Sequence, residues 1–237
     1  MIRLAINGCC GKMGQRIINL ALSDAEFKIA VALERKNHPQ VGTKINNILV
    51  TDDARQVKKA DVIIDFTQAA ATQAILDAAL KHKKAIVIGT TGLEPALIKK
   101  IEEASFLIPV VFSPNMSVGV NLLFRLAKEA ALKLKNYHIN ITEAHHAHKK
   151  DAPSGTAKKL AQIIEEQIKQ EVKDIKSIRE GEIIGDHKVR FESELDTLTL
   201  THQAKTRDIF VRGALEAARW VSKQSAGLYS MQDVLGQ

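Results

Sequence analysis

Short apolar runs alternate with segments of helical periodicity through the first half of the chain. The apolar runs are nearly continuous and predict five strands, at residues 2–7, 27–33, 60–66, 85–88 and 108–112. Apolar residues at helical spacing lie between several of these runs, at residues 17–22, 72–82 and 94–103. Strands that are apolar along nearly their whole length and are separated by helices are typical of a parallel sheet that is covered on both faces. We therefore predict an α/β domain with a doubly wound parallel sheet.

The pattern changes after Asn115. A helix is predicted at about 121–134, and the apolar residues of 137–142 then alternate as in a half-buried strand. Another helix opens at Ser154, and further strands are predicted at residues 178–184, 188–193 and 196–202. The last stretch, about 208–235, is predicted to be helical. These elements indicate a second, α+β domain with an open mixed sheet.

A glycine-rich segment, Gly8-Cys-Cys-Gly-Lys-Met-Gly14, follows the first predicted strand and begins a helix. Glycines there allow a tight turn, and backbone amides can then approach a pyrophosphate at the positive helix end. The spacing departs from the usual Gly-x-Gly-x-x-Gly, and such glycines also form ordinary turns. Glu34 stands 20 residues after Gly14, where an acid binds the adenosine ribose. The adjacent Arg35 could hold a 2′-phosphate. Together they predict a Rossmann-like domain that accepts NADH, NADPH or both.

Two other turns follow predicted strands at the same edge of the sheet. They are Phe66-Thr67 and Gly89-Thr-Thr-Gly92. Glycine and threonine are common in plain turns. Open α/β sheets nevertheless bind ligands at the carboxyl ends of their strands, so several such turns on one edge favour a binding site.

Charge and composition exclude few functions, but they narrow the classes of partner that the protein can bind. The net charge of +7 would attract polyanions, dinucleotides and dicarboxylates alike. Basic residues are spread in short pairs, and two tyrosines with one tryptophan offer few stacking surfaces for bases. We therefore expect a solvated basic surface and no nucleic-acid partner.

Neither a membrane span nor a disulfide is expected. No apolar run approaches the roughly 20 residues that cross a bilayer, and the first residues read as a strand rather than a leader. The two cysteines, Cys9 and Cys10, are adjacent, where normal disulfide geometry is hard to reach. We expect a cytoplasmic protein without membrane contact and without a metal site.

The most unusual segment is rich in titratable groups. His145, His146, His148, Lys149, Lys150 and Asp151 fall within seven positions. A solvated charged loop is the plain alternative, but this density is typical of functional sites. If the strand before it continued, alternation would place Glu143, His145 and Lys149 on one face. Lysine can deliver a proton and meet developing negative charge, and histidine titrates near neutral pH.

An anion-binding helix start follows at once. Asp151-Ala-Pro-Ser-Gly-Thr156 opens a helix for which Ser154 is a plausible N-cap. The amides near Gly155 and Thr156, with the threonine hydroxyl, could bind a carboxylate. An ordinary capped helix is the alternative, but here a proton donor and an anion cradle lie within a dozen residues.

Two alternative functions come from other classes of protein, a hydrolase and a regulator. A zinc hydrolase could use His145, His146 and His148, although no acidic ligand stands at a familiar spacing. A dinucleotide-sensing regulator would account for the basic charge, although no helix-turn-helix module is evident.

The segment from Glu143 to Ala157 closely resembles the signature of the dihydrodipicolinate reductase family. Further segments resemble that family along the chain: residues 8–14, 32–35, 64–67, 89–92, 115–121, 179–187 and 207–220. The resemblance implies NADH- or NADPH-dependent reduction of 4-hydroxy-tetrahydrodipicolinate in lysine and diaminopimelate biosynthesis. It implies a dinucleotide-binding domain of residues 1–116 plus 208–237. Residues 117–207 would bind the dicarboxylate substrate and form a homotetramer.

The resemblance also implies roles for individual residues. His145 would be the acid/base and Lys149 the proton donor, while His146, Gly155 and Thr156 would bind substrate carboxylates. The cofactor would be bound by Gly8, Cys9, Cys10, Gly11, Lys12, Met13, Glu34, Arg35, Phe66, Thr67, Gly89, Thr90, Thr91, Ser113, Pro114, Asn115 and Met116.

The chain departs from the family pattern at two places. Gln68-Ala69 replaces a proline-containing turn that many members have, which affects a local cofactor contact. Many members carry a longer insertion between the positions of Lys169 and Arg179. This chain lacks it, which affects the tetramer surface or the lid over the substrate.

Overall fold

A computed structural model describes residues 1–236, and these divide into two compact units. Unit 1 comprises Met1–Met116 and the C-terminal segment from Phe210, and unit 2 comprises Ser117–Ile209. Gln237, which the predicted first domain includes, lies outside the described residues. No helix among residues 1–236 is both long and apolar enough to span a membrane.

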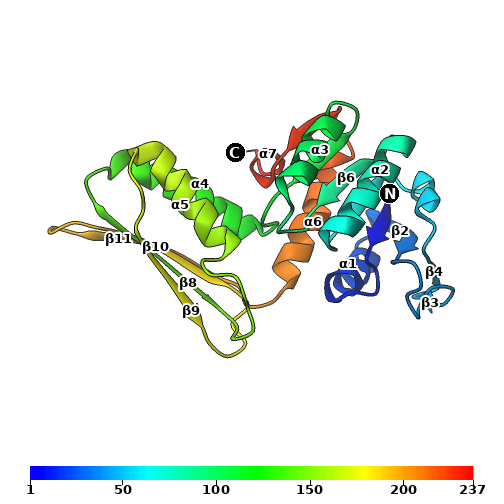
Figure 1. The fold of residues 1–237 in the computed structure, drawn as a ribbon, viewed down its shortest axis with the longest axis horizontal. Coiled ribbons are helices and arrows are strands. Elements are labelled where there is room, and N and C mark those ends of the chain that lie inside the picture. The colour runs from blue at the N-terminus through cyan, green and yellow to red at the C-terminus, as the bar shows by residue number, and fades with distance from the viewer. Residues whose placement is uncertain (237) are drawn as a thin grey trace. The chain divides into compact units, whose positions relative to one another are not determined.

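Unit 1 is built on one large sheet. In spatial order the strands are β12 (Gly227–Tyr229), β7 (Pro109–Phe112), β6 (Ala85–Ile88), β5 (Val62–Asp65), β1 (Ile2–Asn7), β2 (Phe27–Leu33), β4 (Ile48–Thr51) and β3 (Lys44–Ile45). All neighbours are parallel except β3 and β4. The sheet order reverses about β1, which confirms the predicted doubly wound α/β fold (Figure 1).

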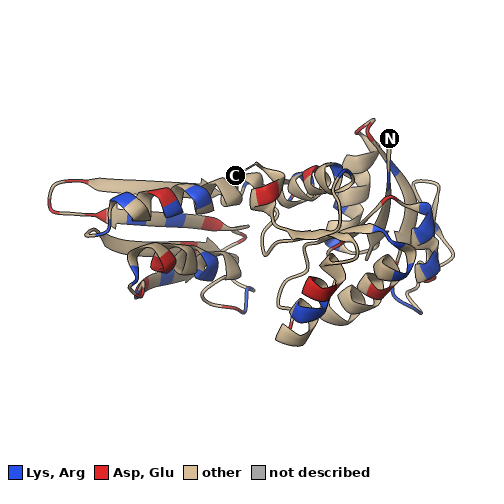
Figure 2. Ribbon diagram, turned by 90° about the horizontal axis from the view of Figure 1, so that it is seen from above, with Lys and Arg blue, Asp and Glu red and all other residues tan. Residues whose placement is uncertain are grey.

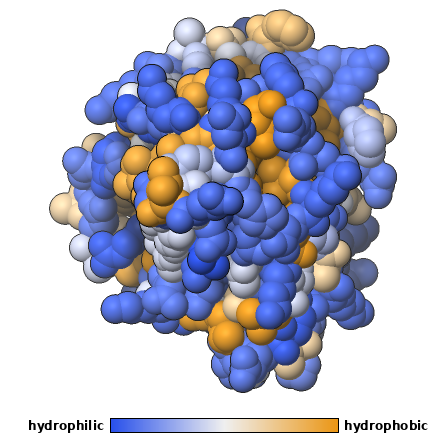
Figure 3. Space-filling view, turned by 90° about the vertical axis from the view of Figure 1, so that its left-hand side faces the viewer, coloured by the Kyte–Doolittle hydropathy of each residue, from blue (hydrophilic) through white to orange (hydrophobic). Residues whose placement is uncertain are grey.

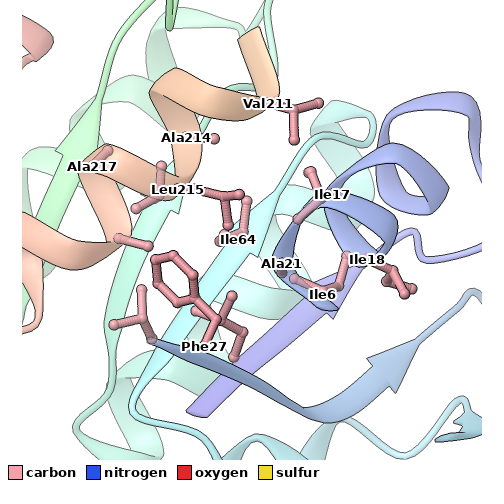
Figure 4. Packing of buried hydrophobic residues seen from close by; sticks show 14 of the residues in the cluster. Ile6, Ile17, Ile18, Ala21, Phe27, Ile64, Val211, Ala214, Leu215 and Ala217 are labelled. Carbon is pink, nitrogen blue, oxygen red and sulfur yellow. The ribbon is translucent and has the colours of Figure 1, made fainter. Parts of the chain in front are cut away.

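Helices cover both faces of this sheet because its strands are apolar on both sides. The helices are α1 (Lys12–Leu22), α2 (Ala69–His82), α3 (Pro95–Ser105), α6 (Asp208–Val221) and α7 (Met231–Val234), with a 3-10 turn at Ala54–Lys59. Along β1, Leu4 and Ile6 point into the core beneath α1 and α6, whereas Ala5 faces the core beneath α2 and α3. Figure 4 shows Ile17 of α1 and Leu215 of α6 in the first core. Burying each such side chain stabilises the fold by about 1.5–3 kcal/mol.

The structure differs from the prediction at three places in the chain. The C-terminal stretch predicted as helical also contains β12, which pairs with β7 and extends the sheet. Residues 180–184 are not a strand, because β9 (Asp174–Arg179) ends before a turn in which Gly181 has a positive φ of 49°. The hairpin of β3 and β4 was not predicted, since a two-residue strand has no detectable period.

Unit 2 is an open four-stranded sheet with helices on one face. The strand order is β11 (Thr197–Gln203), β10 (Asp186–Glu192), β8 (His138–His145), β9, with only β8 and β9 parallel. The helices α4 (Val118–Lys133) and α5 (Gly155–Ile168) pack on the sheet around the fully buried Phe191. The predicted mixed α+β domain is therefore confirmed.

Charged side chains of both signs and apolar side chains share the surface. Basic and acidic residues are interspersed along the helices of both units (Figure 2). The face in Figure 3 is mainly hydrophilic, with separate apolar patches.

Candidate active site

The glycine-rich turn of unit 1 requires glycine for physical reasons. Gly8 has a φ of +74°, which a side chain disfavours. A Cβ on Gly14 would lie 2.1 Å from the carbonyl oxygen of Gly8, so the start of α1 packs directly on the turn. Gly11 is the N-cap of α1, and no side chain caps this helix. The turn therefore presents the positive end of a helix, as a pyrophosphate requires.

Glu34 lies just after β2 and is tied to this turn. Its Oε2 accepts a hydrogen bond from the amide of Cys10 at 3.1 Å, and its Oε1 accepts one from Arg35 at 2.9 Å. Six residues predicted to bind the cofactor line one cleft of about 750 Å³: Gly8, Gly11, Glu34, Arg35, Phe66 and Thr67. The residues present thus fit an adenine dinucleotide with its ribose near Glu34.

Sequence reasoning missed Asp65, which organises the carboxyl edge of the sheet. This carboxylate is fully buried. Its Oδ1 accepts hydrogen bonds from the side chains of Asn7 (2.7 Å) and Thr67 (2.6 Å), and its Oδ2 accepts them from the hydroxyls of Thr72 (2.5 Å) and Thr90 (2.8 Å). Asp65 therefore joins the ends of β1, β5 and β6. Its sequence signals were an acid at a strand end and its place in the family-like segment 64–67.

The other predicted cofactor residues do not line this cleft. Thr90 is buried and uses its hydroxyl for Asp65, and Met116 belongs to the hydrophobic core. Gly89 packs on Phe66, where a Cβ would lie 2.3 Å from the ring. The side chain of Ser113 donates to the carbonyl oxygen of Asn115 at 3.0 Å. Cys9, Cys10, Lys12, Met13, Thr91 and Pro114 are also outside the lining residues.

A three-ligand grouping of metal-binding type occurs among the described residues at Cys9, Cys10 and Glu34, whose ligand atoms lie within 4.8 Å of one another. Cys9 is fully buried, and burial raises the pKa of its thiol. The Cys9 thiol therefore stays protonated and unreactive. Within residues 1–236, His145, His146 and His148 do not form such a grouping.

In unit 2, β8 places Glu143 and His145 on the same buried face, as the alternation predicts. Nδ1 of His145 is hydrogen bonded to Oε2 of Glu143. Arg179, which is aligned with His145 on β9, donates to both carboxylate oxygens of Glu143, at 3.0 and 2.7 Å. Burial opposes ionisation of Glu143, but hydrogen bonds from Arg179, Ser177 and His145 outweigh it and lower the pKa to about 2.

The same surroundings keep His145 neutral. Burial lowers its pKa, and the positive charges of Lys149 and Arg179 lower it further, whereas Glu143 partly counteracts them. The ring of His187 packs edge-on against His145 with centroids 5.2 Å apart. Burial also lowers the pKa of His187, to about 3.

The loop after β8 does not continue the strand. The strand ends at His145, and the amide of Lys149 then donates to the carbonyl oxygen of His146 at 3.1 Å, which closes a turn. Strand alternation was therefore the wrong reason for grouping Lys149 with His145. The Lys149 ammonium instead pairs with Asp151 at 2.8 Å. His146 and His148 form a tilted ring pair with centroids 6.3 Å apart.

The predicted helix start is present as α5. The hydroxyl of Ser154 caps the helix by accepting a hydrogen bond from Ala157 at 3.2 Å. A Cβ on Gly155 would meet no atom within 4 Å, so open space adjoins the helix end. Thr156 is buried beside it. This positive helix end suits a carboxylate.

Arg179 and His187 were also missed as site residues. Their places follow from pairing: β9 aligns Arg179 with His145, and β10 aligns His187 with Glu143. Such register across three strands cannot be read from one segment of sequence.

The doubly wound sheet, the glycine-rich turn and the acid after β2 are typical of dinucleotide-dependent oxidoreductases. Family models described as "Dihydrodipicolinate reductase, N-terminus" and "Dihydrodipicolinate reductase, C-terminus" match residues 2–116 and 119–235. The chain therefore belongs to the dihydrodipicolinate reductase family, and its nucleotide is a pyridine nucleotide.

Individual proteins agree with this assignment. The chain is 38% identical to a 4-hydroxy-tetrahydrodipicolinate reductase of Syntrophus aciditrophicus, covering 100% of this chain and 99% of the relative. It is 41% identical to the enzyme of the same name from Zymomonas mobilis, with coverage of 99% and 97%. The solved structure of a dipicolinate-bound dihydrodipicolinate reductase from Paenisporosarcina sp. TG-14 has the same fold, with a TM-score of 0.83 at 24% identity over 98% of each chain.

Proposed function

We infer that this protein reduces 4-hydroxy-tetrahydrodipicolinate to tetrahydrodipicolinate with NADH or NADPH, in lysine and diaminopimelate biosynthesis. One observation carries the proposal above all others. The signature segment Glu143–Thr156 folds into a buried Glu143–His145 pair beside the positive end of α5, in a chain whose full-length relatives bear this activity's name. Residues 1–116 plus 208–237 would bind the dinucleotide and residues 117–207 the substrate.

The cofactor would be bound in the cleft of unit 1. Glu34 accepts hydrogen bonds from the adenosine ribose, and the exposed guanidinium of Arg35 meets a 2′-phosphate where one is present. The residues from Gly8 to Met13 supply the backbone around the pyrophosphate, and those at 89–91 and 113–116 contribute beyond the cleft. When bound, a reduced nicotinamide supplies the hydride for ring carbon 4 of the cyclic imine that forms when the substrate loses water.

The substrate dicarboxylate would be bound by His146, Gly155 and Thr156. The positive end of α5 stabilises one carboxylate, and Ser154 keeps that end fixed. Lys149 donates a proton to the ring nitrogen, where electron density accumulates during reduction. Asp151, whose pKa is lowered chiefly by Lys149 against the opposing effect of burial, stays ionised and holds the ammonium. Neutral His145 can accept or return a proton near neutral pH.

A coupled assay tests this function. A synthase would make the substrate from pyruvate and aspartate semialdehyde, and the absorbance of NADH or NADPH would be followed after the protein is added. We expect decay that requires both the synthase and this protein. Absence of decay with both nucleotides would contradict the proposal.

Two further properties belong to the proposal. We propose a homotetramer assembled through the sheet of unit 2, one face of which the helices α4 and α5 leave uncovered. We also propose a cytoplasmic location, where reduced nucleotides are supplied. Sedimentation and cell fractionation test these properties separately from activity.

A further inference from the structure

Glu143 has more partners than the orientation of one histidine requires. One oxygen, Oε2, contacts Nδ1 of His145 and one guanidinium nitrogen of Arg179. The other oxygen, Oε1, accepts from the second guanidinium nitrogen at 2.7 Å and from the backbone amide of Ser154 at 3.2 Å. The carboxylate thus joins β8, β9 and the start of α5 at one point.

A charged group this deeply buried is costly unless all its bonding positions are filled. Glu143 has no exposed surface. Its desolvation penalty is offset by the bidentate Arg179 pair and by further hydrogen bonds from His145, Ser177 and the amide of Ser154. Arg179 is itself fixed, because it also donates to the carbonyl oxygens of Ile178 (2.7 Å) and Asp151 (2.6 Å). The second of these bonds holds the loop that carries Lys149.

The contact at Nδ1 determines which histidine nitrogen can exchange protons. Because Glu143 is ionised, neutral His145 donates from Nδ1, and Nε2 is left as the basic atom. Gly185 borders that atom, and a Cβ there would lie only 3.1 Å from Nε2. Glycine at 185 therefore leaves room next to the nitrogen that would exchange protons.

The contact at Ser154 links the same carboxylate to the carboxylate-binding end of α5. Ser154 caps α5 through its hydroxyl and binds Glu143 through its amide. His187 supports it from β10, with Nε2 3.3 Å from the Ser154 hydroxyl. The helix end and His145 are thus fixed by one buried group.

We propose that Glu143 is a positioning residue, held by Arg179, that sets the tautomer of His145 and the place of the α5 helix end together. This rests on the proposed function, in which His145 exchanges a proton and α5 binds a substrate carboxylate. Neither Glu143 nor Arg179 touches the reactants in this scheme. Both act through the groups that do.

The first test is the substitution Glu143→Gln, with Glu129→Gln as its matched control. Glu129 lies exposed on α4 and pairs with Arg125 at 3.0 Å, so the control also removes one carboxylate from an arginine pair. We expect Glu143→Gln to lower kcat by on the order of 100-fold and the control to leave kcat unchanged. Glu143→Asp should retain part of the turnover, because it keeps the charge.

The pH profile separates positioning from a general loss of structure. His145 is faced by Glu143, Arg179, His187 and Lys149. Of these, Glu143 raises the pKa of His145. Removing the Glu143 carboxylate should therefore move the acidic limb of the kcat/KM profile to lower pH. Glu143→Asp should keep the limb near the wild-type position. An unmoved limb in Glu143→Gln would overturn the proposal.

Two readouts do not depend on turnover. In ¹⁵N spectra of labelled histidines, with His145 assigned from a His145→Gln variant, the wild type should show the Nδ1–H tautomer and Glu143→Gln should lose it. Binding of pyridine-2,6-dicarboxylate, followed by calorimetry, should weaken about 10-fold or more in Glu143→Gln and not in the control. Retention of both the tautomer and the affinity would also overturn the proposal.

If Glu143→Gln does not fold, Arg179→Lys supplies the same readouts, since it keeps a positive charge but not the bidentate geometry. We expect each readout to change in the same direction as in Glu143→Gln, but by a smaller amount. A wild-type protein that reduces no substrate would defeat the proposed function alone, because the spectra and the calorimetry still decide the role of Glu143.

Discussion

At the scale of single residues, the proposed function separates groups that would handle protons from groups that would bind carboxylates. Lys149 lies in a turn and pairs with a partly exposed Asp151, whereas Thr156 is buried at the start of α5. The sequence predicted both residues, first from their chemistry and position and then from the family resemblance. It could not predict the buried partners Glu143, Arg179 and Asp65 in their structural roles, because those roles arise where separate strands meet.

The first prediction follows from this separation. Lys149→Ala should lower kcat by about 100-fold or more with a small effect on KM, because a proton donor acts mainly in the transition state. Thr156→Val should mainly raise KM, because it removes a hydroxyl from the carboxylate cradle. Steady-state kinetics of the two variants tests the division. Equal losses in both parameters for both variants would refute it.

A second prediction concerns the choice of nucleotide. Arg35→Ala should raise the KM for NADPH about 10-fold and leave NADH nearly unaffected, because the guanidinium would contact only the 2′-phosphate. Lys36→Ala, a neighbouring change in the same cleft, serves as the comparison. The reverse pattern, with NADH more affected, would show that Arg35 does not read the phosphate.

At the scale of elements, the hydrophobic pattern predicts what is buried and regular. The ranges of β2 and β6 follow directly from their apolar runs. The pattern fails where pairing rather than periodicity makes the strand. β12 has three residues, Gly227-Leu-Tyr229, and becomes a strand because it lies beside β7. Ile183 and Ile184 looked like strand residues, but they follow the turn at Gly181.

A third prediction tests the packing of the elements in unit 2. Phe191 on β10 is fully buried between the sheet and its two helices, whereas Leu195 in the next turn is 96% exposed. Phe191→Ala should lower the free energy of unfolding by about 3–5 kcal/mol, and Leu195→Ala should change it by less than about 0.5 kcal/mol. Urea unfolding followed by circular dichroism measures both. Similar values for the two variants would contradict this core.

At the scale of the whole molecule, buried histidines make stability depend on pH. Burial lowers the pKa of His187 to about 3, whereas the unfolded value is near 6.5. The unfolded chain therefore binds more protons as the pH falls below 6.5, and stability is lost from there toward pH 3. Glu143, with a pKa lowered to about 2, loses its contribution only below its usual value of 4.5.

A fourth prediction isolates His187 in the window between pH 6.5 and 4.5. Stability of the wild type should fall with decreasing pH, and His187 contributes at most about 1.4 kcal/mol per pH unit to that slope. His187→Gln should reduce the slope. Urea denaturation at several pH values gives the slopes. Identical slopes for His187→Gln and the wild type would contradict a neutral buried His187.

The most direct measurement of the central claim is the fate of the transferred hydrogen. Reduced nicotinamide carrying deuterium at the transferable position would be supplied with freshly made 4-hydroxy-tetrahydrodipicolinate, and the product would be examined by NMR and mass spectrometry. The account predicts one deuterium at ring carbon 4 of tetrahydrodipicolinate, formed at a much lower rate by Lys149→Ala. Product without the label, or oxidation of the nucleotide without this product, would contradict it.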